Sequence, residues 1–408
     1  MDRKCRRSVA LFPFYYGFGI DLLFYVAIDT LFLTTVKGFA ESQFLTLAAI
    51  ATTVSLALRL PLLWVAKKLG NTAALRMGAA SLLAGSIMIT FGTTFPVIAI
   101  GRCLRFVNAT ITDICLVPTL ENNLARLGKE EAFLPIRTKG STCYSAITLA
   151  ISLVAASMFN INPYLPMYCC IAGAATGFTL SLLSGDFSGD LPEEKVSRRT
   201  KEKVALAPFL LLALLSFSLL FAAISNGIGD NKLFMQHCLL PHISVQQVAT
   251  LIGIVYFLSR LARLLSNVFF VRLYRKCKEN TGFAVWSTAL VGFSLVIAGA
   301  YLPGIWAKVS VMGAGYVLTL FACDPTKLYI QQVIVRYTPR QQHRTLFAYM
   351  GLSFSIFTAL ASLLSPIALL YFPMVIVPIL LLGMAILSLF VLFALYRQLQ
   401  NRTPVITV

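Results

Sequence analysis

Charge is scarce in this sequence. Only 12% of the 408 residues are Asp, Glu, Lys or Arg, which is about half of the charged fraction of ordinary soluble domains. Hydrophobic residues make up 58% of the chain. This balance excludes an ordinary water-soluble domain and is typical of membrane proteins.

Acidic residues are the scarcer of the two charge types, with 16 Asp and Glu against 34 Lys and Arg and a net charge of +18. Such an excess can indicate nucleic-acid binding. Here, however, most basic residues lie between apolar runs on one side of the predicted membrane, and only Lys37 and Lys308 are expected on the other side. This bias predicts that both termini are cytoplasmic. We therefore expect a lipid bilayer, and no nucleic acid, around the chain.

Residues suited to metal or cofactor chemistry are also few. Of only three histidines, His237 and His242 lie with Cys238 in one outer loop, where they could bind a metal adventitiously. The nine cysteines lie mostly within apolar runs, at spacings that fit neither zinc nor a disulfide framework. A Gly-rich phosphate loop of the Walker type is missing, which argues against direct ATP drive. We predict no cofactor and no resident metal.

Long polar segments are missing as well, which bears on two alternatives from other classes. A membrane sensor normally carries a soluble signalling domain, and the longest polar segment, 184–204, is too short for one. A membrane-embedded enzyme needs a nucleophile with an orienting partner, and His343 has no obvious nucleophile beside it. Both alternatives are therefore less favoured, and we predict that the protein is not an enzyme.

Apolar runs of about 20 residues, each long enough to cross a bilayer, are abundant instead. They predict an all-α polytopic membrane protein with twelve transmembrane helices, at 12–36, 42–66, 72–93, 95–117, 139–159, 163–184, 205–235, 244–271, 282–302, 305–325, 345–371 and 373–396.

The polar segment divides these spans into two sets of six. The predicted domains are an N-terminal six-helix bundle at 1–184, a cytoplasmic linker at 185–204 and a C-terminal six-helix bundle at 205–408. Corresponding spans share short similarities, which indicate pseudo-symmetric halves. Asp29 and Asp230 are 201 residues apart, as are Arg59 and Arg260, whereas Asp113 and Asp324 are 211 residues apart.

This architecture resembles the major facilitator superfamily over essentially the whole chain. The loop after the second span of that family usually reads Gly-x-x-x-Asp-Arg-x-Gly-Arg-Arg. Here it reads LWVAKKLGNT, in which Lys68 and Gly70 fit, whereas Leu63 and Lys67 replace the first Gly and the Asp. The loop therefore lacks its usual carboxylate.

Two further family motifs separate possible subfamilies. The fourth span keeps Arg102 of an Arg-x-x-Gln-Gly motif but continues with Arg105 and Phe106. The fifth span, STCYSAITLAISLV, has no Gly-Pro motif of the kind found in drug–proton antiporters. The resemblance thus implies a twelve-span transporter fold without defining a subfamily.

Charged residues inside the spans are the candidate functional residues, because intramembrane charge is costly and usually faces protein or a water-filled cavity. Asp29 and Asp230 lie toward the outer ends of spans one and seven, and the resemblance implies that they flank an outer gate. The alternative is that each caps a local helix break, and this structural interpretation has the greater weight.

Two arginines and two carboxylates share a level toward the cytoplasmic side. Arg59 and Asp113 lie in the first half, and Arg260 and Asp324 lie in the second. We predict an inner gate in which Arg59 pairs with Asp113, or Arg260 with Asp324, in at least one access state. Permanent bridges within each half remain an equal alternative.

Asp21 has no charged counterpart in the second half, since its equivalent is Ala222. It is predicted to lie near the midplane at the level of Arg102. Burial disfavours a charged carboxylate and a nearby arginine favours it, so such a group can gain and lose a proton. We predict that Asp21 is the proton-coupling residue, with a fixed Asp21–Arg102 bridge as the alternative.

Together these patterns predict a secondary active transporter that moves a small organic solute with protons by alternating access, with a slight preference for anionic or zwitterionic solutes. The alternative is a drug/proton antiport efflux pump. We expect a monomeric multi-pass protein of the plasma membrane. Other side chains predicted to reach the cavity are Tyr16, Tyr25, Arg105, Asn108, Asn226, Lys232 and Gln236.

Overall fold

The computed structural model describes residues 2–187, 207–338 and 342–400, and all regular secondary structure in these ranges is helical. The predicted linker falls outside the described residues from position 188 onward. The first half contains α1 (Asp2–Phe18), α2 (Leu23–Leu31), a π-helical turn (Phe32–Val36), α3 (Glu41–Leu69), α4 (Asn71–Phe91), α5 (Phe95–Arg126), α6 (Phe133–Ile161) and α7 (Leu165–Leu183).

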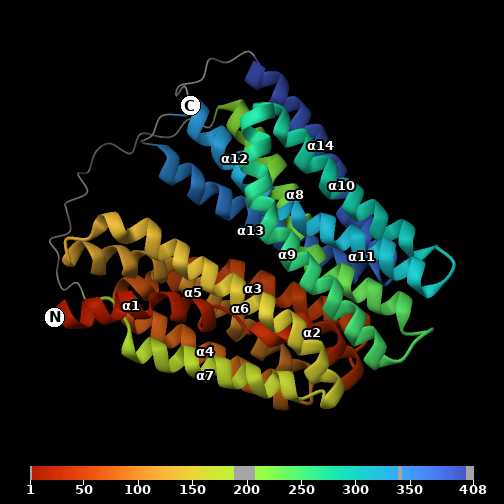
Figure 1. Cartoon of the computed structure of the whole chain (residues 1–408), viewed down its shortest axis with the longest axis horizontal. Helices are drawn as coiled ribbons and strands as arrows, with labels where there is room; N and C mark the ends of the chain where they lie inside the picture. Colours follow the sequence, from red (N-terminus) through yellow and green to blue (C-terminus); the bar gives the residue numbers. More distant parts are fainter. Residues whose placement is uncertain (1, 188–206, 339–341, 401–408) are drawn as a thin grey trace. The chain divides into compact units, whose positions relative to one another are not determined.

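The second half contains α8 (Pro208–Leu239), α9 (Val245–Cys277), α10 (Thr281–Ala300), α11 (Ile305–Phe321), α12 (Cys323–Tyr337), α13 (His343–Ala368) and α14 (Ile376–Gln400). Figure 1 shows the helices in sequence order, from red to blue.

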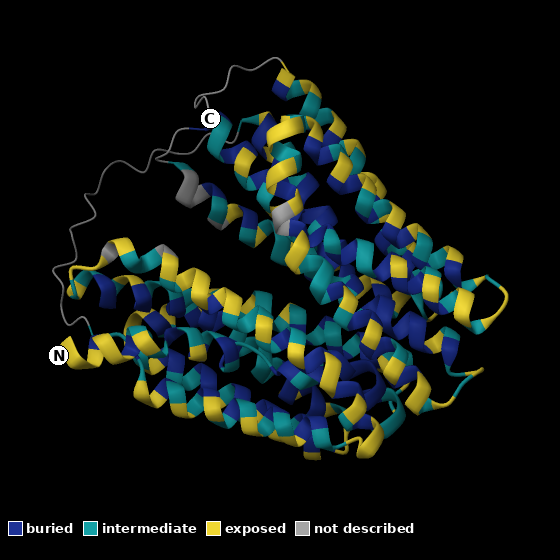
Figure 2. Ribbon diagram, in the orientation of Figure 1, coloured by how far each residue is buried: buried dark blue, intermediate teal, exposed yellow. Residues whose placement is uncertain are grey.

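Twelve stretches of these helices are long and apolar enough to cross a membrane, as the sequence predicts. Large apolar side chains remain exposed on them, including Leu60, Trp64 and Phe390 at 76%, 62% and 69%. Figure 2 shows exposed residues along helix faces that point away from neighbouring helices. Exposed apolar area on this scale suits lipid rather than water. The chain is therefore a multi-pass integral membrane protein.

The described residues form two compact units. The first contains the chain up to Phe32 and from Ile50 to the end of α7, and the second contains Leu33–Ala49 together with α8 to α14. The same neighbours recur in both units. In the first unit α1 packs on α6 and α7, and α4 on α5 and α7; in the second α8 packs on α13 and α14, and α10 on α11 and α14. The halves are thus pseudo-symmetric in their internal packing.

One pair of helices in each unit crosses at two glycines. A Cβ on Gly85 of α4 would lie 2.7 Å from the Gly101 carbonyl oxygen of α5, and one on Gly315 of α11 would lie 2.5 Å from the Gly292 carbonyl oxygen of α10. Small residues allow this backbone approach in membranes, where helix association depends on close packing.

Two predicted spans are interrupted in the structure. The first is interrupted at residues 19–22, between α1 and α2. The tenth does not end at 325, because α12 continues it to Tyr337 after an interruption at Ala322. Gly19 and Pro325 are the local signals, since glycine is a poor helix former and proline lacks the backbone N–H that an unbroken helix needs.

Candidate functional site

The interruption of the first span places Asp21 between two helices rather than on one. Residues 19–22 leave the helical conformation, and Asp21 Oδ1 accepts a hydrogen bond from the Leu22 backbone N–H at 2.7 Å. Gly177 of α7 allows the break to pack closely, because a Cβ there would lie 2.9 Å from the Gly19 Cα. Broken helices inside membranes are tolerated where protein or a cavity satisfies the freed backbone groups.

Arg105 of α5 holds the Asp21 carboxylate with two hydrogen bonds. Arg105 Nε lies 2.5 Å from Asp21 Oδ1, and Nη2 lies 2.9 Å from Oδ2. The two side chains are 16% and 21% exposed. The sequence predicts Arg102 as the partner, whereas the bidentate contact belongs to Arg105, the arginine one turn further along α5. This fork geometry makes a strong, oriented ion pair.

Neighbouring helices satisfy the backbone of the break. Asn108 Nδ2 donates to the carbonyl oxygens of Gly19 and Ile20 at 2.9 and 3.1 Å. The Tyr25 N–H donates to Cys170 Sγ of α7 at 3.0 Å. Asn108 is therefore a positioning residue of the break, whereas the sequence predicts that it lines a cavity.

Further charges surround this ion pair inside the first unit. Tyr25 is fully buried, and Arg102, Arg105 and Asp29 all act on it electrostatically. Arg105 also lies over the Tyr25 ring, 5.8 Å from its centroid. Asp29 is buried, and its Oδ1 accepts a hydrogen bond from the N–H of Thr30. We call Asp21, Tyr25, Asp29, Arg102 and Arg105 the first-unit charge cluster.

The predicted inner-gate residues of the first unit are more exposed than the charge cluster. Asp113 of α5 is exposed, and Arg59 of α3 is half-buried. Tyr16 packs against the rings of Phe12 and Tyr144. The Arg59–Asp113 pairing stays a prediction.

Polar residues on α8 mostly contact other helices of the second unit. Asn226 Oδ1 accepts a hydrogen bond from Ser362 of α13 at 2.8 Å, and Asp230 Oδ2 accepts one from Ser365 at 3.3 Å. Gln236 Nε2 donates to Thr34 Oγ1 at 2.5 Å. These residues, predicted to line a cavity or gate, hold α8 against its neighbours in this structure.

Two basic side chains of the second unit lie against the same aromatic ring. Lys232 Nζ lies 5.3 Å from the centroid of Tyr256 on α9, and the Arg260 guanidinium lies 4.8 Å from it. Arg260 also donates a hydrogen bond to the Tyr256 hydroxyl. Lys232 and Tyr256 are 2% and 3% exposed, so this group is inside the unit.

Asp324 is the second residue of α12, which begins at Cys323 directly after the interruption at Ala322. Its carboxylate accepts two hydrogen bonds from Arg263 of α9, at 2.9 Å from Nε and 2.8 Å from Nη2. The predicted pairing of Asp324 with Arg260 in at least one access state stays a prediction; in this structure the arginine one turn further along α9 holds the carboxylate. A carboxylate in the first turn also suits the positive end of the helix.

We expect the side chains of Arg263 and Asp324 to be energetically coupled, so that substitutions of the two are not additive. The side chains are 32% and 26% exposed, so solvent screening limits the coupling free energy to about 1 kcal/mol. Thermal unfolding of Arg263→Gln, Asp324→Asn and the double variant measures it. The combination of Arg260→Gln with Asp324→Asn is the control and should be additive; additivity in the first cycle as well would contradict the pairing.

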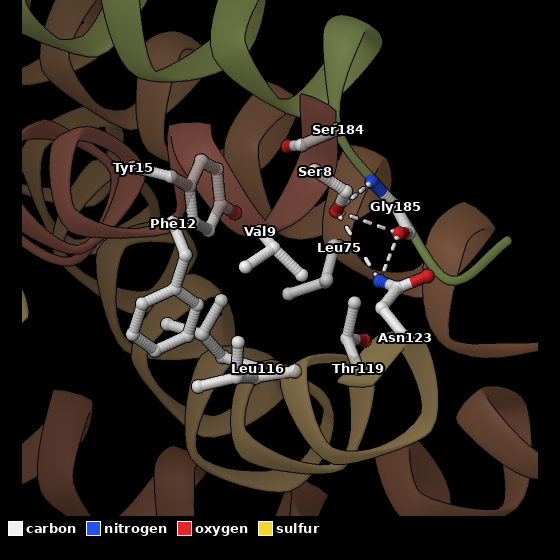
Figure 3. Close-up of a pocket in the computed structure, with 11 residues that line it drawn as sticks. Ser8, Val9, Phe12, Tyr15, Leu75, Leu116, Thr119, Asn123, Ser184 and Gly185 are labelled. Carbon is white, nitrogen blue, oxygen red and sulfur yellow. Dashed lines mark hydrogen bonds between the residues drawn. The ribbon is translucent and has the colours of Figure 1, made fainter. Parts of the chain in front are cut away.

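The end of α7 is fastened to three other elements of the first unit. Figure 3 shows Ser8, Asn123 and Gly185 pointing toward one another. Ser8 Oγ and Asn123 Nδ2 each donate to the Gly185 carbonyl oxygen at 2.8 Å. The cavity beside them measures about 10 Å³, room for about one water molecule. This cluster is a structural joint rather than a ligand pocket.

Asp186 continues the joint toward the start of α4. Its Oδ2 accepts hydrogen bonds from Asn71 at 3.0 Å and Asn122 at 2.7 Å, and its backbone N–H donates to Thr72 Oγ1 at 2.8 Å. A carboxylate therefore does reach the loop in which Lys67 replaces the family's Asp. The local sequence does not indicate this carboxylate, because it comes from a distant segment of the chain.

Removing this carboxylate should destabilise the protein. Asp186→Ala loses two charge-assisted hydrogen bonds, at a cost of about 2 kcal/mol, which corresponds to a melting temperature lower by about 5 °C. Thermal unfolding of the purified protein measures the change. Glu121→Ala is the matched control, because Glu121 is exposed on α5 beside Asn122; equal shifts for both variants would refute the role.

Solved structures share this fold over nearly the whole chain. A bacterial homologue of the iron transporter ferroportin superposes with a TM-score of 0.70 at 13% identity, covering 96% of this chain and 98% of that one. The nucleoside transporter NupG superposes with a TM-score of 0.69 at 14% identity, covering 97% of this chain and 99% of that one. A bacterial metal transporter superposes with a TM-score of 0.68 at 14% identity, covering 96% of this chain and 98% of that one.

These likenesses confirm the predicted resemblance to major facilitator superfamily transporters at the level of the fold. No protein-family model and no curated protein matches the sequence. Within the described residues, no three His, Cys, Asp or Glu side chains gather as a metal ion would require.

Proposed function

We propose that this protein is a secondary active transporter that moves a small organic solute by alternating access, and that the Asp21–Arg105 pair couples the movement to protons. The observation that carries the proposal is the position of this bidentate ion pair in the break of the first span. Intramembrane carboxylates at helix breaks are typical of transporter sites.

Protonation of Asp21 would act on two elements at once. Asp21 Oδ1 accepts hydrogen bonds both from Arg105 Nε and from the N–H of Leu22, the residue before α2. A proton on the carboxylate removes the charge that strengthens both contacts. The proton would thereby weaken both the hold of α5 on the break and the hydrogen bond from Leu22, just before α2. Such a local change between two discrete arrangements is what a coupling site requires.

The solute class follows from the residues and not from the structural neighbours. Those proteins are named as transporters of nucleosides, iron or metals, and identities of 13% and 14% leave the cargo of this chain open. Arg102, Arg105 and Lys232 favour an anionic or zwitterionic solute. We further propose a monomer in the plasma membrane that performs no chemical step on the solute.

The transport proposal is tested in two stages. A panel of metabolites and drugs is first screened for a rise in the melting temperature of the purified protein, because a ligand that binds the native state stabilises it. The ligand found is then offered to proteoliposomes with and without an imposed pH gradient. We expect the solute to accumulate only with the pH gradient. Equal uptake in both conditions would show that transport is not coupled to protons.

The orientation is tested separately. The basic residues predict that the termini and the 185–204 segment face the cytoplasm. A cysteine replacing Ser197, which lies outside the described residues, should not react with an impermeant thiol reagent in intact cells beyond the parent protein. It should react after the cells are opened. Labelling in intact cells would show that this segment faces outward and would contradict the predicted topology.

A further inference from the structure

An apolar groove lies in the second unit beside the interruption between α11 and α12. Its volume is about 220 Å³, and an apolar cavity of roughly 150 Å³ is already large enough to bind benzene. Helices α9 and α10 and the start of α12 line it. We call it the α9–α10 groove and define it by Ser266, Phe269, Leu273, Ala284, Thr288 and Pro325.

The groove is chemically suited to an apolar occupant. The polar side chains in its lining, those of Ser266 and Thr288, already have hydrogen-bond acceptors on their own helices. Ser266 Oγ donates to the Arg263 carbonyl oxygen at 2.7 Å, and Thr288 Oγ1 donates to the Ala284 carbonyl oxygen at 2.8 Å. Apolar cavities in proteins stay dry. A polar solute or a metal ion would therefore find little to bind there.

The groove opens on a surface of exposed apolar side chains. Phe269 and Ala284, which line it, are both exposed. Val291 is exposed as well, and it lies seven residues after Ala284 on the same face of α10. In a protein that crosses a bilayer, such a surface contacts lipid chains. A lipid chain can thus enter the groove from the side.

Basic residues follow the groove toward the C-terminal end of α9. Arg272, Arg275 and Lys276 are all exposed there. Arg272 lies three residues after Phe269, and Lys276 lies three residues after Leu273, so each is the next side chain beyond a lining residue. They are about 4.5 and 10 Å further along the helix axis than Phe269. The apolar groove thus has a positively charged end.

Carboxylates of the neighbouring elements do not remove this positive charge, because each is engaged by another arginine. Asp324 Oδ1 lies 2.8 Å from Arg263 Nη2, and Glu279 Oε1 lies 2.7 Å from Arg336 Nη1. Exposed basic side chains near the end of a membrane helix extend toward the headgroups and attract anionic lipids.

We propose that the α9–α10 groove binds one acyl chain of an anionic phospholipid, whose phosphate contacts Arg272 and Lys276. The bilayer is itself apolar, so the chain contributes mainly packing contacts to the binding, whereas the phosphate contributes selectivity for the headgroup. The bound chain lies against Pro325, directly after the interruption at Ala322. It therefore supports α12 at the point where the tenth span is broken.

Lipid binding is tested on the intact protein, purified in detergent and depleted of lipid. The probes are dioleoylphosphatidylglycerol, dioleoylphosphatidylcholine with the same chains and a zwitterionic headgroup, and glycerol 3-phosphate without chains. We expect the anionic lipid to raise the melting temperature in a saturable manner, and at lower concentration than the zwitterionic lipid. Glycerol 3-phosphate should have no effect. Equal responses to the two lipids, or an equal response to glycerol 3-phosphate, would overturn the inference.

Charge variants test the headgroup contact. Arg272→Gln and Lys276→Gln should each weaken the apparent affinity for the anionic lipid by about fivefold. Arg275→Gln is the matched control on the same helix. Arg275 lies two residues after Leu273 and six after Phe269, spacings that do not share a helix face, so its replacement should leave the affinity unchanged. Equal losses in all three variants would show general surface attraction and overturn the site.

A space-filling variant tests the chain contact. Ala284→Leu places a larger side chain in the groove and should weaken binding of the anionic lipid by several-fold. Ala298→Leu is the control, because Ala298 is exposed on the same helix about 21 Å further along its axis. If Ala284→Leu binds the lipid like the parent, the chain lies elsewhere and the inference is overturned. The charge variants test the site even if Ala284→Leu does not fold, since their side chains are exposed.

Discussion

Asp21→Asn is expected to abolish accumulation of the solute against its gradient while the protein still folds. The amide copies the shape of the protonated carboxylate, so it holds one state permanently and cannot carry a proton. It also leaves Arg105 without the charge that now accepts two of its hydrogen bonds. Downhill exchange can continue, because binding and reorientation do not require the proton to move. Proteoliposome uptake with and without a pH gradient separates the two activities.

Two further variants sharpen this test. Asp21→Glu keeps a titratable group at a shifted position and should retain part of the gradient-driven uptake. Asp29→Asn is the control within the same cluster, since Asp29 is buried nearby but its Oδ1 accepts a hydrogen bond from the adjacent Thr30 N–H. It should slow uptake and leave its dependence on pH intact. Normal accumulation by Asp21→Asn would reduce the Asp21–Arg105 pair to a structural bridge.

The fold was predictable because its signals are repeated many times along the chain. Each span carries its own apolar run, and an error of a few residues at one end does not change the number of spans. The matched spacing of charges in the two halves also made the pseudo-symmetry predictable. Breaks are harder to predict, since residues 19–22 lie inside an apolar run and only Gly19 and Asp21 indicate the interruption.

The ion pairs show where prediction from sequence ends. In both units the predicted arginine lies three residues from the observed one: Arg102 instead of Arg105, and Arg260 instead of Arg263. Residues three apart share a helix face and differ in depth by about 4.5 Å. The depth of Asp21 is counted along an unbroken first helix, but that span is interrupted at residues 19–22, and α9 extends beyond its predicted end to Cys277. An uncertainty of one turn was therefore unavoidable.

Contacts between distant segments could not be predicted at all. Asp186 was placed in a linker, yet its carboxylate binds Asn71 and Asn122, which are 115 and 64 residues away. Nothing in the local sequence of any of the three indicates this partner. The role of Asn108 was missed for the same reason, because it serves backbone carbonyls that exist only where the first span is broken.

Gly315→Ala is expected to cause the largest loss of stability of any substitution considered for the second unit. The new Cβ would lie 2.5 Å from the Gly292 carbonyl oxygen and 2.7 Å from the Val296 backbone nitrogen. Both are backbone atoms of α10, so no side chain can move aside and the two helices must separate. Overpacking of this kind costs about 3 kcal/mol, and the melting temperature should fall by about 5–10 °C.

A second glycine provides the matched control. Gly383 lies inside α14 with no atom within 4 Å of the position a Cβ would occupy. Gly383→Ala should leave the melting temperature unchanged or raise it slightly, because alanine is the better helix former. Gly85→Ala should repeat the loss in the first unit, where the Gly101 carbonyl oxygen lies 2.7 Å from the new Cβ. If Gly315→Ala melts like Gly383→Ala, close backbone contact is not what holds α10 to α11, and side-chain packing along the two helices becomes the better explanation.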